Sequence, residues 1–197
     1  MSIKGGNNTD KTMFGVLDIV RVFSSFSLSP AKALRKENSE LSFWSLIIPA
    51  LTYVFFAIQL VIDRFSFVPT MSGIKALLTV FIALIVGVCL SLASVGLLYA
   101  VLNIKAIKSD FQCLLLCFDF SYIISLFISF VGFLVCLIFG MPTTITFGIS
   151  AVLFALIPYG RLSKELLKDN LVWYVFTVAA NGILSVFAVN IILFSVN

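Results

Sequence analysis

Five long stretches of apolar residues, separated by shorter polar connectors, dominate the hydrophobic pattern of this chain. A membrane core about 30 Å thick is crossed by about 20 apolar residues of α-helix. Backbone polar groups in lipid must be hydrogen-bonded within their own segment, which favours helices. The pattern therefore predicts an all-α membrane protein, a five-transmembrane-helix bundle formed by residues 41–197. The expected spans are Ser42 to Ile62, Ala76 to Leu102, Cys113 to Phe139, Thr143 to Tyr159 and Leu171 to Phe194.

The connectors carry turn signals and charges. Gly140-Met141-Pro142 predicts a tight reversal between the third and fourth spans, and Asp63 to Gly73 predicts a longer loop. The segments Asn103 to Gln112 and Gly160 to Asn170 are expected to be charged connectors. The fourth span is short and lies between Pro142 and Pro158.

Residues 1–40 form a basic leader ahead of the first span. Met13 to Phe26 is apolar around most of a helix and too short to cross a membrane, so it predicts an N-terminal amphipathic interfacial helix. Docking of this helix against the cytoplasmic ends of the spans is the alternative. Ser29-Pro30 predicts the start of a second short helix that ends at Glu37. The candidate lipid-facing basic residues, which otherwise only set the topology, are Lys32, Arg35 and Lys36.

The basic residues are distributed unevenly between the two sides of the predicted bundle. Eleven of the 13 Lys and Arg residues lie in the leader, the second connector or the fourth connector. Only Arg64 and Lys75 fall on the other side. Because cytoplasmic loops carry the excess of Lys and Arg, we expect a cytoplasmic N-terminus, an extracytoplasmic C-terminus and a location in the cell membrane.

Composition excludes two other classes of protein. Apolar residues make up 61% of the chain, charged residues 11%, and the mean hydropathy is +1.16. A soluble domain has about a quarter of its residues charged, so a water-soluble globule is excluded. The 21 Phe residues and long aliphatic runs exclude a disordered chain.

The sequence offers little chemistry for catalysis. Histidine is absent, which excludes an imidazole base or ligand. The four cysteines lie in or beside apolar runs and are interpreted as small packing residues; Cys113 and Cys117 would need two further ligands to hold a metal. No phosphate-binding loop, nucleophile elbow or pair of intramembrane acids is present. We therefore expect no enzymatic activity, no cofactor or metal, and no nucleic-acid partner.

Asp119 is the acid that stands inside an apolar run, and such residues are candidates for function. Three readings are open. In the first, the span begins near Ser121, and the carboxylate lies at the cytoplasmic interface with Lys105, Lys108 or a leader arginine as its partner. In the second, it makes a structural polar contact inside the bundle. In the third, it takes part in proton or ion translocation. The candidate polar site comprises Asp119, Ser121, Tyr122 and Asn181.

Other polar and small residues in the spans predict helix packing. Hydrogen bonds between helices are expected from Gln59, Ser91, Ser94, Asn181 and Asn190. A small-residue face on the second span, which allows a close approach of another helix, is expected from Gly87, Ala93, Gly96 and Ala100.

Several segments resemble the bacterial Yip1-domain family of integral membrane proteins. These are Leu17-Asp18-Ile19-Val20 in the leader, the stretch Ser29 to Leu34 before Trp44, and the polar-aromatic segment from Phe111 to Tyr122. The resemblance covers roughly residues 14–195 and implies a helical membrane domain without established catalytic residues. The aspartate-rich motif and Gly-Tyr pairs of the eukaryotic relatives are not clearly present, so a Rab-linked role is not carried over.

Two functional hypotheses follow. The first is a non-enzymatic membrane adaptor or organiser that binds the lipid bilayer and other membrane proteins, or associates with itself. The second is a small transporter or permease subunit that works as a homo-oligomer, with Asp119, Tyr122 and Asn181 lining a path.

Overall fold

The computed structural model describes residues 45–67, 72–167 and 170–196, without the side chains of residues 65–67. Within these ranges the chain is helical except at its turns and contains no strand. The helices are α4 (Ile47–Phe67), α5 (Gly73–Ile104), α6 (Phe111–Ser121), α7 (Ile123–Phe139), the π-helix η1 (Thr144–Ile149), α8 (Ser150–Leu167) and α9 (Leu171–Val196). The predicted leader helices and the basic residues Lys32, Arg35 and Lys36 lie outside the described residues.

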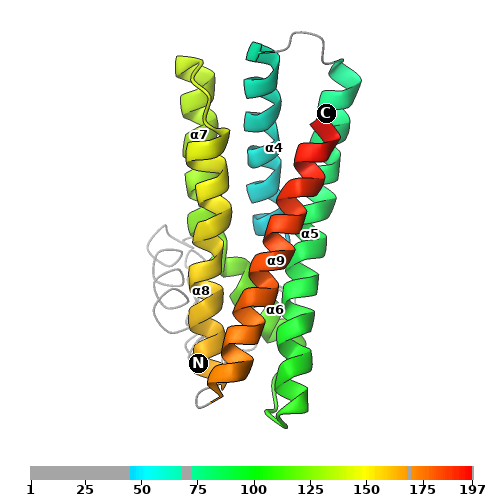
Figure 1. Cartoon of the computed structure of the whole chain (residues 1–197), viewed down its shortest axis with the longest axis vertical. Helices are drawn as coiled ribbons and strands as arrows, with labels where there is room; N and C mark the ends of the chain where they lie inside the picture. Colours follow the sequence, from blue (N-terminus) through cyan, green and yellow to red (C-terminus); the bar gives the residue numbers. More distant parts are fainter. Residues whose placement is uncertain (1–44, 68–71, 168–169, 197) are drawn as a thin grey trace, which may run out of the picture.

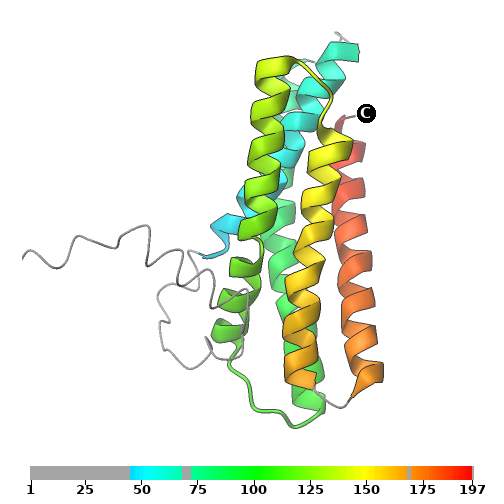
Figure 2. The same cartoon turned by 90° about the vertical axis from the view of Figure 1, so that its left-hand side faces the viewer.

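The helices run up and down alternately (Figures 1 and 2). In these views α4 rises, α5 descends, α6 and α7 rise, η1 and α8 descend, and α9 rises again. Five helical stretches are long and apolar enough to cross a membrane: Ile47–Arg64, Gly73–Ile104, Phe111–Phe139, Thr144–Leu167 and Leu171–Val196. The predicted class, an all-α membrane protein with five transmembrane helices, is confirmed.

Polar residues mark the helix ends. The Ser72 side chain accepts a hydrogen bond from the Lys75 backbone N–H (3.3 Å) at the start of α5, and Asp110 accepts one from the Gln112 N–H (3.3 Å) at the start of α6. Both are N-caps that satisfy otherwise free N–H groups. Gly140 ends α7 with a left-handed φ of 62°, a conformation that glycine adopts without steric cost. The reversal predicted at Gly140-Met141-Pro142 therefore occurs there.

Several helices are longer than their apolar stretches. Residues from Asp63 to Phe67, predicted to begin a loop, still belong to α4. Likewise α8 continues through Pro158 to Leu167, although the fourth span was expected to end at Tyr159. Proline is tolerated within membrane helices when neighbouring helices support the chain. Here the side chains beyond it remain buried, namely Tyr159, Leu162 and Leu167.

The third span is divided at Tyr122, which separates the short α6 from α7. The span expected from Cys113 to Phe139 therefore contains a break between two helices, and the apolar stretch runs from Phe111 to Phe139. The helix α6 lies at the lower end of the bundle, where it packs against α5 and α8 (Figures 1 and 2).

Close packing in the bundle depends on glycines. A Cβ atom on Gly87 of α5 would lie 2.7 Å from the Ala50 Cα atom of α4. A Cβ atom on Gly132 of α7 would lie 2.3 Å from the Phe147 Cβ atom, and one on Gly148 would lie 2.6 Å from Phe56 Cδ2. Such distances leave no room for a side chain, so these positions bring the helices together.

Candidate functional site

Small polar side chains lie in the interior of the bundle among larger aromatic and aliphatic ones, and large apolar side chains also cover the outside. This is the distribution expected of a membrane protein, because lipid solvates the outer face and polar groups hold helices together. Buried polar residues lie on all the long helices, namely Ser45, Thr52 and Gln59 near or on α4, Thr79, Ser91 and Ser94 on α5, Ser125 and Ser129 on α7, Ser163 on α8, and Thr177, Asn181 and Ser185 on α9.

Asp119, near the end of α6, is completely buried in this interior. The Ser45 hydroxyl donates a hydrogen bond to its Oδ2 atom (2.7 Å), and the Ser91 hydroxyl donates one to Oδ1. In the described part of the chain no lysine or arginine pairs with Asp119, so the expected partners Lys105 and Lys108 are not its partners. Asp119 thus makes polar contacts inside the bundle, which is one of its three readings.

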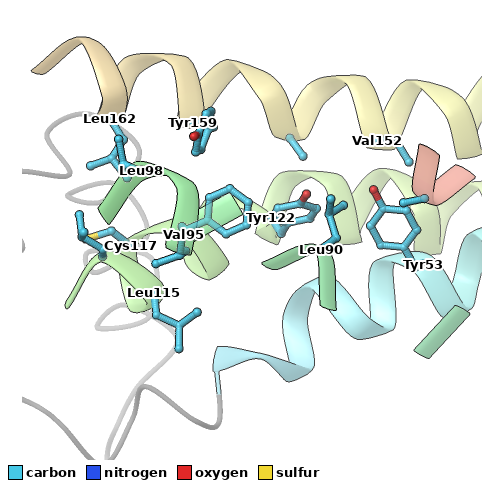
Figure 3. Close-up of a cluster of buried hydrophobic side chains, with 14 of the residues drawn as sticks. Tyr53, Leu90, Val95, Leu98, Leu115, Cys117, Tyr122, Val152, Tyr159 and Leu162 are labelled. Atoms are coloured by element: carbon cyan, nitrogen blue, oxygen red, sulfur yellow. The ribbon is translucent and has the colours of Figure 1, made fainter. Parts of the chain in front are cut away.

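Three buried tyrosines follow one another along the interior beside Asp119. Figure 3 shows Tyr159, Tyr122 and Tyr53 in succession between α8 and α4. Tyr122 lies close to Asp119 and to both other tyrosines. The Phe118 ring packs between two of these tyrosines. Its centroid lies 5.3 Å from that of Tyr122 and 5.4 Å from that of Tyr159. The hydroxyls of Tyr53 and Tyr159 have no hydrogen-bond partner among the described residues.

A second polar contact lies one helical turn along α5. The Ser94 hydroxyl donates to Asn181 Oδ1 of α9 (2.5 Å), and the Asn181 Nδ2 group has no partner among the described residues. Ser91 and Ser94 are three positions apart on the buried side of α5, so Asp119 and Asn181 are bonded to adjacent turns of one helix. The sequence-predicted Asp119, Tyr122 and Asn181 therefore all belong to one polar interior.

The other predicted polar residues behave differently. Ser121 donates to the Phe118 carbonyl of its own helix (2.5 Å) and does not reach another helix. Gln59 donates to the Ser129 carbonyl (2.7 Å), which confirms the expected contact between helices. The prediction for Asn190 is wrong, because its exposed side chain donates to Val186 O one turn back on α9.

A further site at the far end of α4 was missed by the sequence reasoning. Asp63 Oδ2 accepts hydrogen bonds from the backbone N–H groups of Thr143 (3.1 Å) and Thr144 (2.9 Å) and from the Thr144 hydroxyl (2.5 Å). The Cys136 thiol lies 3.5 Å from Oδ1. This carboxylate caps the first turn of η1 and fixes the turn between α7 and η1 to α4. Two of these donors are backbone N–H groups, and the residue type at a position does not indicate whether its backbone N–H will bind a distant carboxylate.

The four cysteines differ in their surroundings: Cys89 is exposed, Cys136 contacts Asp63, and Cys117 is buried. Cys113 and Cys117 lie one turn apart on α6, and Cys117 is buried in the apolar cluster that includes Leu98 and Leu115. Within residues 45–67, 72–167 and 170–196, no three His, Cys, Asp or Glu side chains gather as a metal site would require.

Comparison with known proteins gave no match to a family model, to a curated protein or to a solved structure.

Proposed function

We propose that this chain is a non-enzymatic, Yip1-like membrane adaptor or organiser that binds other membrane proteins or lipids through the outer faces of its helices. On this proposal it resides in the cell membrane, with the N-terminus in the cytoplasm and the C-terminus outside. The three glycines at helix crossings favour a fixed bundle, because a close-packed interior has few alternative arrangements. The outer surface is then the part that is free to engage partners.

The observation that carries the proposal is a small-residue face on the outside of α5. Cys89, Ala93 and Ala100 are exposed, and a Cβ atom on Gly96 would meet nothing within 4 Å. These four positions follow helical spacing, so they form one stripe that the other helices of the bundle leave uncovered. Small residues on a lipid-facing helix permit another membrane helix to approach closely.

The polar end of the bundle supports the proposed orientation. Lys105, Lys108, Arg161 and Lys164 all lie at the end where α5 and α8 finish and α9 begins (Figures 1 and 2). The Lys105 ammonium lies 5.2 Å from the centroid of the Trp173 ring. Basic residues beside an aromatic ring are typical of the cytoplasmic interface, where they also attract anionic lipid headgroups.

A crosslinking experiment tests the adaptor. A photo-crosslinking residue replaces Ala100 on the stripe, or Ile183 on the outside of α9 as a reference position, in the full chain in native membranes. We expect a reproducible product from Ala100 that Gly96→Leu suppresses at least severalfold. Gly182→Leu is the matched control, because its added Cβ atom also meets open space. Equal products from both positions, or no effect of Gly96→Leu, contradict the proposal.

The second candidate is a small transporter or permease subunit that works as a homo-oligomer. It is favoured by one observation, a fully buried carboxylate at the break between α6 and α7, since acids inside membrane proteins mark ion and proton pathways. Proton-coupled uptake into vesicles should fall severalfold in Asp119→Asn. An unchanged flux contradicts this candidate.

A further inference from the structure

Asp119 carries its carboxyl group in the fully buried interior of the bundle. An ionised carboxylate in a low-dielectric interior requires a compensating charge, and its burial is costly without one. Among the described residues Asp119 has two serine hydroxyls as donors and no cationic partner. Hydroxyl donors alone leave the negative charge uncompensated. Within the described ranges, therefore, no group balances a negative charge on Asp119.

In the described ranges the titratable groups near Asp119 are uncharged. Tyr122, between α6 and α7, lies close to Asp119, and Tyr53 of α4 and Tyr159 of α8 lie close to Tyr122. The α5 face contributes Ser91, and Cys117 lies on α6 itself. A set of hydroxyl and carboxyl groups with no basic residue suits the smallest cation, the proton, which binds one oxygen and needs no further ligands.

Unpartnered polar groups also lie in the interior of the bundle, and one of them, the Tyr53 hydroxyl, belongs to a neighbour of Tyr122. The hydroxyls of Tyr53 and Ser125 are completely buried and have no hydrogen-bond partner in the described ranges. The Tyr53 hydroxyl lies near those of Tyr122 and Ser185. Buried polar groups of this kind are normally satisfied by ordered water. Water among these hydroxyls would connect Asp119, through Tyr122, to Tyr53 and Ser185.

We propose that Asp119 is a proton-binding site in the interior of the bundle. A proton delivered by water forms an O–H bond on one carboxyl oxygen, and the reverse step returns it to water. Ser45 and Ser91 hold the carboxyl group in place, and the hydroxyls of Tyr122 and Tyr53 form the route by which the proton arrives and leaves. The inference rests on the second candidate function only for the use made of the proton, not for the binding itself.

Infrared spectroscopy of the full chain in lipid vesicles tests the site. We expect the carbonyl stretching band of a protonated carboxyl group, shifted in heavy water, to appear as pH falls and to be lost in Asp119→Asn. Asp110→Asn is the matched control, because Asp110 is an exposed N-cap, and it should leave the band in place. Absence of the band at every pH, or its persistence in Asp119→Asn, overturns the proposal.

Ser91→Ala keeps the test decisive if the asparagine variant fails to fold. This variant retains the carboxyl group but removes one hydrogen-bond donor, so the band should move to higher frequency. A band that does not move overturns the assignment to Asp119. Displacement of the band by sodium or potassium at constant pH shows a metal-cation site and also overturns it. A band that behaves as expected without proton flux upholds the site while rejecting transport.

Discussion

The two carboxylates that hold helices together differ in their donors. Asp63 accepts two backbone N–H groups and a threonine hydroxyl at the start of η1, so its negative charge meets the positive end of a helix. Asp119 accepts two serine hydroxyls, which carry no net charge. We therefore expect Asp63 to hold α4 to the start of η1, and Asp119 to be the group that exchanges a proton.

Replacing Asp63 by Asn tests its structural role. The change removes the charge and one acceptor oxygen from a site of at least three donors, and hydrogen bonds to charged groups contribute about 1.5–3 kcal/mol. We expect the free energy of unfolding to fall by about this amount, as measured by detergent-induced unfolding followed by circular dichroism. Asp110→Asn is the same chemical change at an exposed N-cap and should cost only a few tenths of a kcal/mol. Equal effects would contradict the assigned role.

The two asparagines of α9 provide a second matched pair. Asn181 is buried and bonded to Ser94 of α5, whereas the exposed Asn190 bonds its own helix. Asn181→Ala should lower the free energy of unfolding by about 1–2 kcal/mol, the range for polar contacts between membrane helices. Asn190→Ala should change it by less than about 0.5 kcal/mol, as at most surface positions. The free energies are again measured by detergent-induced unfolding. A loss from Asn190→Ala equal to or larger than that from Asn181→Ala would contradict the assignment.

The sequence identified Asp119 but not its surroundings. An acid in an apolar run stands out, yet its partners Ser45 and Ser91 lie 74 and 28 positions away along the chain. Hydropathy describes each span separately and has no information about which distant side chain faces it. Asp63 was not singled out, because it ends an apolar stretch and resembled the first residue of a loop.

At the scale of the helix, small residues determine which faces meet. Gly87 was expected to share one face with Gly96, but the two positions are nine residues apart, about two and a half turns. They therefore point to opposite sides of α5, with Gly87 against Ala50 of α4 and Gly96 facing open space. Within the described bundle, the expected close approach of another helix occurs at Gly87. Ala93 and Ala100 are exposed and join Gly96 on the outer stripe.

Alanine at these two glycines should have opposite effects. At Gly87 the new Cβ atom would meet the backbone of Ala50 and Pro49, which cannot move aside, so we expect a loss of about 1–3 kcal/mol in unfolding free energy. At Gly96 the Cβ atom meets nothing, and the higher helix propensity of alanine should add up to about 1 kcal/mol. Thermal unfolding in one detergent compares the two variants. A destabilising Gly96→Ala would contradict the outward placement.

Helix boundaries were predicted less well than helix identity. The apolar stretches end where charged residues begin, whereas α4 and α8 continue for several residues beyond them. Backbone hydrogen bonding does not stop at the edge of the hydrophobic region, and Tyr159, Leu162 and Leu167 of α8 remain packed. Hydropathy indicates where an apolar stretch of the chain ends, and a helix can continue beyond that residue.

For the molecule as a whole, five alternating spans followed directly from the sequence. The constraint is strong, because the backbone N–H and C=O groups of a segment in lipid must form hydrogen bonds within the protein. The structure adds that the basic residues from two separate connectors gather at one end, since both α5 and α8 finish there. At about 48 Å, α5 also exceeds the thickness of the membrane core, so its ends must tilt or extend into the headgroup regions.

Accessibility to a membrane-impermeant maleimide tests the orientation. In a cysteine-free chain, Lys75→Cys should be labelled in intact cells, because Lys75 begins α5 at the end opposite the basic cluster. Lys108→Cys should be labelled only after the membrane is opened. The reverse pattern would place the basic end outside and contradict the charge argument.

The long separations of the interior hydrogen bonds affect how the bundle can be made. Ser45 meets an acceptor 74 residues later, Asp63 meets a donor 81 residues later, and Ser94 meets its acceptor 87 residues later. A ribosome releases the chain from its N-terminus, so α4 and α5 enter the bilayer before their partners have been synthesised. The polar groups of α4 and α5 therefore lack these hydrogen-bond partners until the later helices have been inserted, α9 last of all.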